Sequence, residues 1–275
     1  DESSSDESGS AESSATGSAG SGASSTTSAT ATSAGSASGS GGGSSSDEGS
    51  GSDSEGSSDG GSTGDVVTDF ALAFDGSGGA ISDAYVWDAA DFTVEAWIQI
   101  VDEDNSSGIL VDHQDVAAGV GWSFFVHADW HVFTLVFFDG GHAQQTVVGG
   151  SPQQLGVGWH HVAATKNGAI VAIHMDGVAL PTVPCSPTVA VSNVPFSIGD
   201  RPGGYSDPLH GINVDDVRIT DVARYSANFS PPVAFDDDDD TVVALTFDEG
   251  DGTSAQDLSG IEFAIAAPQW VAGHE

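Results

Sequence analysis

The chain has almost no positively charged side chains. Only four of its 275 residues are Lys or Arg, against 41 Asp and Glu, which gives a formal net charge of −37. A surface of that sign repels nucleic-acid phosphates and anionic lipid head groups, because binding there releases no counterions. We therefore expect no nucleic-acid partner. The charge agrees better with cation binding or with solubility in salty water.

Cysteine and long apolar runs are equally scarce. The only cysteine, Cys185, cannot form an intrachain disulfide, and it lies between prolines in a loop without a catalytic partner. We expect it to be a small packed side chain. No apolar run reaches the about 18 residues that a membrane-spanning helix needs, so we expect no membrane insertion by this chain.

Residues 1–64 lack every aromatic and every large aliphatic side chain, as well as Pro, Lys and Arg. Such a segment cannot bury enough apolar surface to fold, so we expect a disordered, acidic linker. A linker of this composition spans roughly 40–50 Å and typically spaces a domain away from a surface. The folded domain is then residues 65–275. Because the chain starts with Asp1 rather than Met, we expect a processed, exported protein at the cell surface or outside the cell, anchored through this linker.

Residues from Phe70 onward show the two-residue period of half-buried β-strands. In Phe92–Val101, Val94 and Ile98 share one face, and Glu95 and Trp97 share the other. Asp176-Gly177 predicts a tight hairpin turn. Further strands are predicted at residues 70–74, 108–111, 121–126, 131–138, 146–148, 159–165, 169–175, 195–199, 212–219, 242–247 and 262–266. A dozen short strands without an amphipathic helix predict an antiparallel β-sandwich.

The strand at Ile212–Ile219 changes phase in its middle. Val214 and Val217 are both apolar although three positions apart, so one extra residue at Asp215-Asp216 predicts a β-bulge. β-Bulges change the direction in which side chains point, and they often lie next to binding sites. The alternative is that both carboxylates are simply exposed to solvent.

Five motifs in a fixed order carry a family resemblance. They are Ala71–Gly76 (ALAFDG), Phe92–Ile98 (FTVEAWI), Gly158–Ala163 (GWHHVA), His174–Val178 (HMDGV) and Gly211–Ile219 (GINVDDVRI). This series resembles the laminin G-like branch of the concanavalin A-like lectin/glucanase superfamily, over residues 70–271. The resemblance implies a jelly roll of two curved antiparallel sheets. Residues 241–271 are similar to the segment that opens many members, so we expect them to supply a permuted edge strand.

The resemblance also implies a structural Ca²⁺ at the edge of the sandwich. The matching positions are Asp75, Asp215 and Asp248, whose carboxylates are the hard oxygen ligands that calcium prefers. The alternative is that these aspartates cap turns. We interpret the run Asp236–Asp240 as a solvated acidic loop. Zinc is not expected, because His160 and His161 are adjacent on a strand and point to opposite faces.

Tryptophans near predicted turns are the candidate ligand contacts, because a flat ring stacks on the apolar face of a sugar. They are Trp87, Trp122 and Trp130, the last flanked by His127 and His131. Burial beneath a loop is the alternative for each of them. We expect Trp97 and Trp159, which stand in core motifs of the family, to be packing residues rather than ligand contacts.

The glycosidases of this superfamily carry a pair of carboxylates in a Glu-x-Asp-x-Glu type of strand. That motif is absent from the sequence, so we expect no enzyme activity. Two functions remain. The first is a tethered module that binds glycans or an extracellular protein through its loops. The second is a structural or adhesive spacer without a small-molecule ligand, and a glycoside hydrolase is the least favoured alternative.

Overall fold

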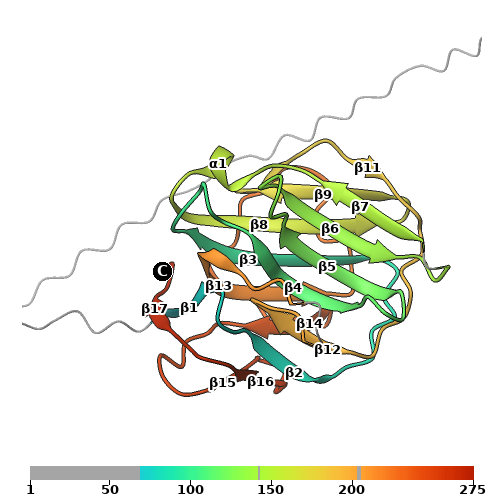
Figure 1. The fold of residues 1–275 in the computed structure, drawn as a ribbon. Coiled ribbons are helices and arrows are strands. Elements are labelled where there is room, and N and C mark those ends of the chain that lie inside the picture. The colour runs from blue at the N-terminus through green and yellow to red at the C-terminus, as the bar shows by residue number, and fades with distance from the viewer. Residues whose placement is uncertain (1–68, 142, 203–205) are drawn as a thin grey trace, which may run out of the picture. The chain divides into compact units, whose positions relative to one another are not determined.

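The computed structural model describes residues 69–141, 143–202 and 206–275. These residues form a two-layer β-sandwich in which every strand pairing is antiparallel, as the sequence predicts. The two sheets are stacked face to face (Figure 1). The predicted linker, residues 1–64, lies outside the described residues, and so does the start of the predicted domain. No helix among the described residues is long and apolar enough to cross a membrane.

Sheet A has nine strands and sheet B has eight. The strands of sheet A are β1 (Phe70–Asp75), β3 (Phe92–Ile100), β8 (Gly158–Asn167), β9 (Ile170–Met175), β10 (Val178–Ala179), β11 (Val183–Pro184), β13 (His210–Thr220), β14 (Thr241–Leu245) and β17 (Trp270–Ala272). Those of sheet B are β2 (Ala80–Ala84), β4 (Gly108–Asp115), β5 (Val120–Val126), β6 (Phe133–Phe138), β7 (Gln144–Val148), β12 (Pro195–Ile198), β15 (Ser254–Gln256) and β16 (Glu262–Ile265). One short helix, α1 (Pro152–Leu155), precedes β8.

The alternation of each strand decides which side chains enter the core. In β3, Val94, Ala96, Ile98 and Ile100 are buried between the sheets, and the intervening residues face outward on sheet A. Sheet B contributes the large rings of Trp122, Phe124, Phe133 and Phe137. The predicted hairpin turn is confirmed, since Asp176 and Gly177 both adopt positive φ, at 48° and 73°, between β9 and β10.

The predicted β-bulge in β13 is also confirmed. Val214 pairs with Ile98 of β3 but Val217 pairs with Ala96, so β13 has one residue more than its neighbour. On its other side, β13 pairs first with β1 and then, beyond the bulge, with β14.

The C-terminal segment supplies strands to both sheets. β17 pairs with β1 in sheet A, and β16 pairs with β2 in sheet B.

Residues 221–240, here called the covering segment, lie against the outward face of sheet A. The Val222 carbonyl accepts a hydrogen bond from Thr93 Oγ1 at 3.1 Å, and the Pro232 carbonyl accepts one from Trp97 Nε1 at 3.0 Å. Trp97 therefore packs between sheet A and this segment, which agrees with the packing role expected from the sequence. The covering segment thereby buries part of the outward face of sheet A, including Thr93 and Glu95.

Candidate functional site

The outward face of sheet B carries a groove with an apolar floor, here called the sheet B groove. Phe125 of β5 and Val136 and Phe138 of β6 alternate with core residues and therefore project away from the core. A shift in register within β4 places Ile109 beside Phe125. These four side chains line a cavity of about 210 Å³.

A second cavity adjoins the first. Its volume is about 350 Å³, and the two cavities share Gln114, Val116 and Arg201. Arg201 donates from Nε and Nη2 to Asp112 Oδ1, at 3.0 and 2.7 Å. Burial raises the pKa of Asp112, and the charge and hydrogen bonds of Arg201 only partly oppose that effect. The ion pair fixes two polar groups at the junction of the cavities.

Gln114 is the polar group best placed to receive a ligand. Its side chain is 7 % exposed and lines both cavities, yet its Nε2 has no hydrogen-bond partner among the described residues. An unpaired buried amide costs about 1–3 kcal/mol, and a ligand oxygen in the groove would remove that cost. The sheet B groove thus has a hydrogen-bonding amide beside an apolar floor.

A row of aromatic rings leads from Phe125 in the groove to Trp130 at the surface. The ring of His127 lies 6.2 Å from Phe125 and stacks on Trp130 at 4.2 Å and 11°. The amide of Asp129 donates to His127 Nδ1 at 3.1 Å, which holds the ring in place. Trp130 is 62 % exposed, so its face is open to solvent. Of the three candidate tryptophans, Trp130 alone is positioned for surface contact.

Trp87 and Trp122 occupy the core instead. They are 3 % and 0 % exposed, and their rings pack edge to face at 6.0 Å. Trp122 also stacks on Phe92 at 5.2 Å. A ligand could reach either ring only by displacing core side chains, so the burial alternative describes both.

The bulge in β13 buries its two carboxylates, contrary to the solvent-exposed alternative. Asp215 is 0 % and Asp216 is 4 % exposed. Burial and the neighbouring charge of Asp215 raise the pKa of Asp216 to about 8. His274 donates to Asp215 Oδ2 at 2.8 Å and, through its other ring nitrogen, to the Val233 carbonyl at 2.7 Å. Burial alone would lower the pKa of His274, but the contact with Asp215 and this carbonyl raises it to about 9.

The three candidate calcium ligands are not all brought together. Ligand atoms of Asp69, Asp215 and His274 lie within 4.8 Å of one another, and this group includes neither Asp75 nor Asp248. The Asp75 carboxylate accepts hydrogen bonds from Ser77 N at 3.0 Å and Gln269 Nε2 at 2.6 Å, as a turn cap would.

Asp248 is exposed, and its charge acts on Asp216. Asp215 Oδ1 is buried without a hydrogen-bond partner among the described residues, and such an oxygen fits calcium. The imidazole of His274, which is hydrogen-bonded to the other carboxylate oxygen, does not fit a calcium site. Calcium therefore stays a prediction.

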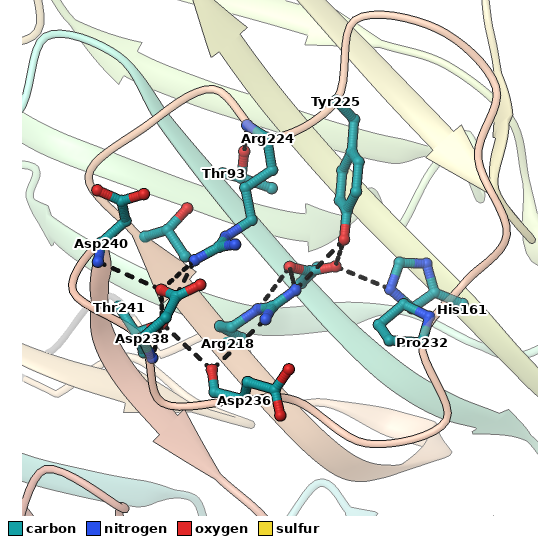
Figure 2. Close-up of polar contacts among 12 residues, drawn as sticks. Thr93, His161, Arg218, Arg224, Tyr225, Pro232, Asp236, Asp238, Asp240 and Thr241 are labelled. Carbon is teal, nitrogen blue, oxygen red and sulfur yellow. Dashed lines mark hydrogen bonds and ion pairs between the residues drawn. The ribbon is translucent and has the colours of Figure 1, made fainter.

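Glu95 forms the centre of a buried polar network beneath the covering segment. Its carboxylate accepts hydrogen bonds from His161 Nε2 at 3.0 Å, Arg218 Nε at 2.8 Å and the Tyr225 hydroxyl at 2.7 Å. Figure 2 shows Arg218, Tyr225 and His161 converging from sheet A and the covering segment. Burial would raise the pKa of Glu95, but His161 and Arg218 outweigh it and lower the value. This carboxylate is enclosed and fully hydrogen-bonded.

Sequence analysis missed the groove residues. Arg201 lies in an irregular segment after β12, which offers no periodicity to read. One available signal was the sequence of β6, FTLVFF, which is apolar on both faces. In a two-layer sandwich only one face of a strand meets the core, so such a strand predicts an apolar outward surface.

Comparison with known proteins identifies the family. The family model described as the concanavalin A-like lectin/glucanases superfamily, Laminin G type, matches residues 74–228. The chain belongs to this superfamily. No curated protein matches its sequence.

Solved structures with similar folds include three from distant organisms. A proposed carbohydrate-binding protein from Bacteroides ovatus is 16 % identical, with a TM-score of 0.58 over 76 % of this chain and 61 % of the other. The SAP-like pentraxin of Limulus polyphemus is 15 % identical, with a TM-score of 0.43 over 58 % and 79 % of the two chains. Domains LG4-5 of the mouse laminin α1 chain are 14 % identical, with a TM-score of 0.45 over 58 % and 44 %. The chain thus spans about three fifths of the Bacteroides ovatus protein, and these likenesses bear on the fold alone.

Proposed function

We propose that this domain is a non-catalytic module that binds glycan chains along the sheet B groove, outside the cell. The observation that carries the proposal is the amide of Gln114, which has no hydrogen-bond partner among the described residues and lies beside an apolar floor of Phe125, Val136 and Phe138. Sugars present both an apolar C–H face and hydroxyl groups, so they match a floor of this kind bordered by hydrogen-bonding groups. The fold shared with a proposed carbohydrate-binding protein agrees with this function.

The absence of catalysis is part of the proposal. Hydrolysis of a glycosidic bond requires two carboxyl groups that face the substrate across roughly 5–10 Å. In the sheet B groove, Asp112 is tied to Arg201. Glu95 is buried on the outward face of sheet A and satisfied by three donors. Neither is a free acid beside a bound sugar. Asp115 and Asp207 also line the groove, but they do not stand in the Glu-x-Asp-x-Glu type of strand that the glycosidases of this superfamily carry.

A glycan array probed with residues 65–275 tests the proposal, and it is followed by titration calorimetry on the chains that bind. Gln114→Leu removes a buried amide that has no partner, so it should leave the melting temperature unchanged or higher while weakening binding. Phe125→Ala should weaken binding about tenfold, because it removes part of the apolar floor. Ile170→Ala changes an exposed apolar residue on sheet A and is the matched control.

Binding that is lost in both groove variants and kept in the control supports the proposal. If no glycan binds, the glycan-binding function is wrong and the structural spacer takes its place. If glycans bind but the groove variants bind as well as the wild type, the site lies elsewhere.

A further inference from the structure

The walls of the sheet B groove carry more negative than positive charge. Asp112, Asp115 and Asp207 line its two cavities, and Arg201 is the single basic residue among the described lining residues. Because Arg201 is hydrogen-bonded to Asp112 through two nitrogens, these two charges largely cancel. Asp115 and Asp207 are partly exposed and remain without a basic partner among the described residues.

The other Lys and Arg side chains of the domain do not offset this charge. Each of the other three Lys and Arg residues is engaged elsewhere. Lys166 donates to three main-chain carbonyls, Arg218 pairs with Glu95, and Arg224 pairs with Asp238. Residues 65–275 hold 31 of the 41 acidic residues of the chain against these four bases. An anionic ligand that approaches the groove therefore meets repulsion both locally and at long range.

We infer that the sheet B groove selects uncharged glycans and rejects sulfated or uronate-containing chains. The inference rests on the proposed glycan-binding function and names the ligand class for that site. Uncharged sugars can place a C–H face on Phe125 and Val136 and a hydroxyl oxygen near Gln114 without bringing a second negative charge to Asp115 or Asp207. A sulfate or carboxylate on the same backbone would be repelled by both aspartates.

Matched pairs of chains provide the test. Galactan oligosaccharides with and without sulfate, and xylan oligosaccharides with and without glucuronate, are titrated into the full chain at 0.15 M NaCl. For any backbone that binds, we expect the anionic member to bind about tenfold more weakly than the neutral member. The difference should shrink at 1 M NaCl, where the Debye length falls to about 3 Å.

Charge variants connect the selectivity to the groove. Asp115→Asn together with Asp207→Asn should bring the ratio of neutral to anionic affinity towards one. The control double variant, Asp251→Asn with Glu262→Gln, changes the net charge equally through exposed residues of the β14–β15 connection and of β16. Since sheet B runs from β15 and β16 at one edge to β7 at the other, this control should keep the ratio.

The two ideas fail in different ways. If anionic members bind as tightly as their neutral partners, or if both double variants change the ratio alike, the selectivity is wrong while glycan binding stands. If no member of any pair binds, glycan binding itself is wrong.

Discussion

Replacing Arg218 by Met would leave the Glu95 carboxylate buried without its cation. Both side chains are almost completely enclosed, at 6 % and 0 % exposure, and their closest N–O distance is 2.8 Å. Breaking a buried ion pair from one side costs about 3–5 kcal/mol, because the remaining charge loses its partner but not its burial. For a domain of about 200 residues this corresponds to a melting temperature lower by roughly 6–20 °C.

The pH dependence of stability separates this mechanism from a simple packing defect. In the wild type the pKa of Glu95 is lowered on folding, so its contribution is complete above the unfolded value of 4.5 and is lost as the pH falls further. Without Arg218, less opposes the effect of burial, so the folded pKa of Glu95 should be higher in the variant than in the wild type. The variant should therefore gain stability relative to the wild type as the pH falls from 7 towards 5.

Arg224→Met is the matched control for this experiment. Arg224 belongs to the covering segment and pairs with Asp238, whose side chain is 42 % exposed (Figure 2). An exposed pair contributes about 0–1 kcal/mol, so this variant should melt within a few degrees of the wild type. Thermal unfolding followed by circular dichroism at pH 5, 6 and 7 measures both variants. Equal losses in the two, or parallel pH profiles for Arg218→Met and the wild type, would refute the role of the Glu95–Arg218 pair.

Two further predictions concern the bulge and the only lysine of the chain. We propose that calcium binds at Asp215, and a hundredfold excess over its Kd should then stabilise the domain by about 2.7 kcal/mol. Calcium should raise the melting temperature more than equal magnesium, and Asp215→Ala should abolish that difference; equal responses to both ions would contradict the site. Lys166→Met should lower the free energy of unfolding by about 3–5 kcal/mol, because it orphans the carbonyls of Ala90, Gly168 and Pro187, which Lys166 Nζ contacts at 2.8–3.0 Å. A loss below 1 kcal/mol in urea denaturation would show that water replaces the lysine.

Periodicity in the sequence predicted most of the described strands but missed β2, β10, β11, β15 and β17, of which β2 is the longest. The buried positions of β2 are Ala80 and Ser82, whereas Ile81 faces partly outward. The buried positions are therefore small or polar and the outward position is apolar, which is the reverse of the usual alternation. The sequence does not predict a strand here. Ser82 can be buried because its Oγ donates to the Asp83 carbonyl and accepts from Phe196 N. This compensation is visible only in the folded chain.

The candidate site was harder to predict, because its parts come from segments without a repeating pattern. Trp130 and Trp87 both lie in irregular segments, and composition alone does not distinguish them. The difference comes from tertiary packing. Trp87 packs against the rings of Phe92, Trp122 and Phe196, whereas the ring contact of Trp130 among the described residues is with His127. The bulge at Asp215 could be predicted from its phase slip, but the burial of its carboxylates depends on His274, which is 59 residues away in sequence.

The outward-facing side chains of the two sheets find their partners in different ways. Each sheet carries large aromatic side chains on its outward face, where exposure to water is unfavourable. Trp97 on sheet A and Phe125 on sheet B are examples. On sheet A the chain covers its own surface, because the covering segment supplies Tyr225 and the Pro232 carbonyl as partners. Over β4, β5 and β6 the described residues leave two adjoining cavities with an unpaired amide between them. A ligand on sheet B would therefore supply to Phe125 and Gln114 the apolar contact and hydrogen bond that the covering segment supplies to sheet A.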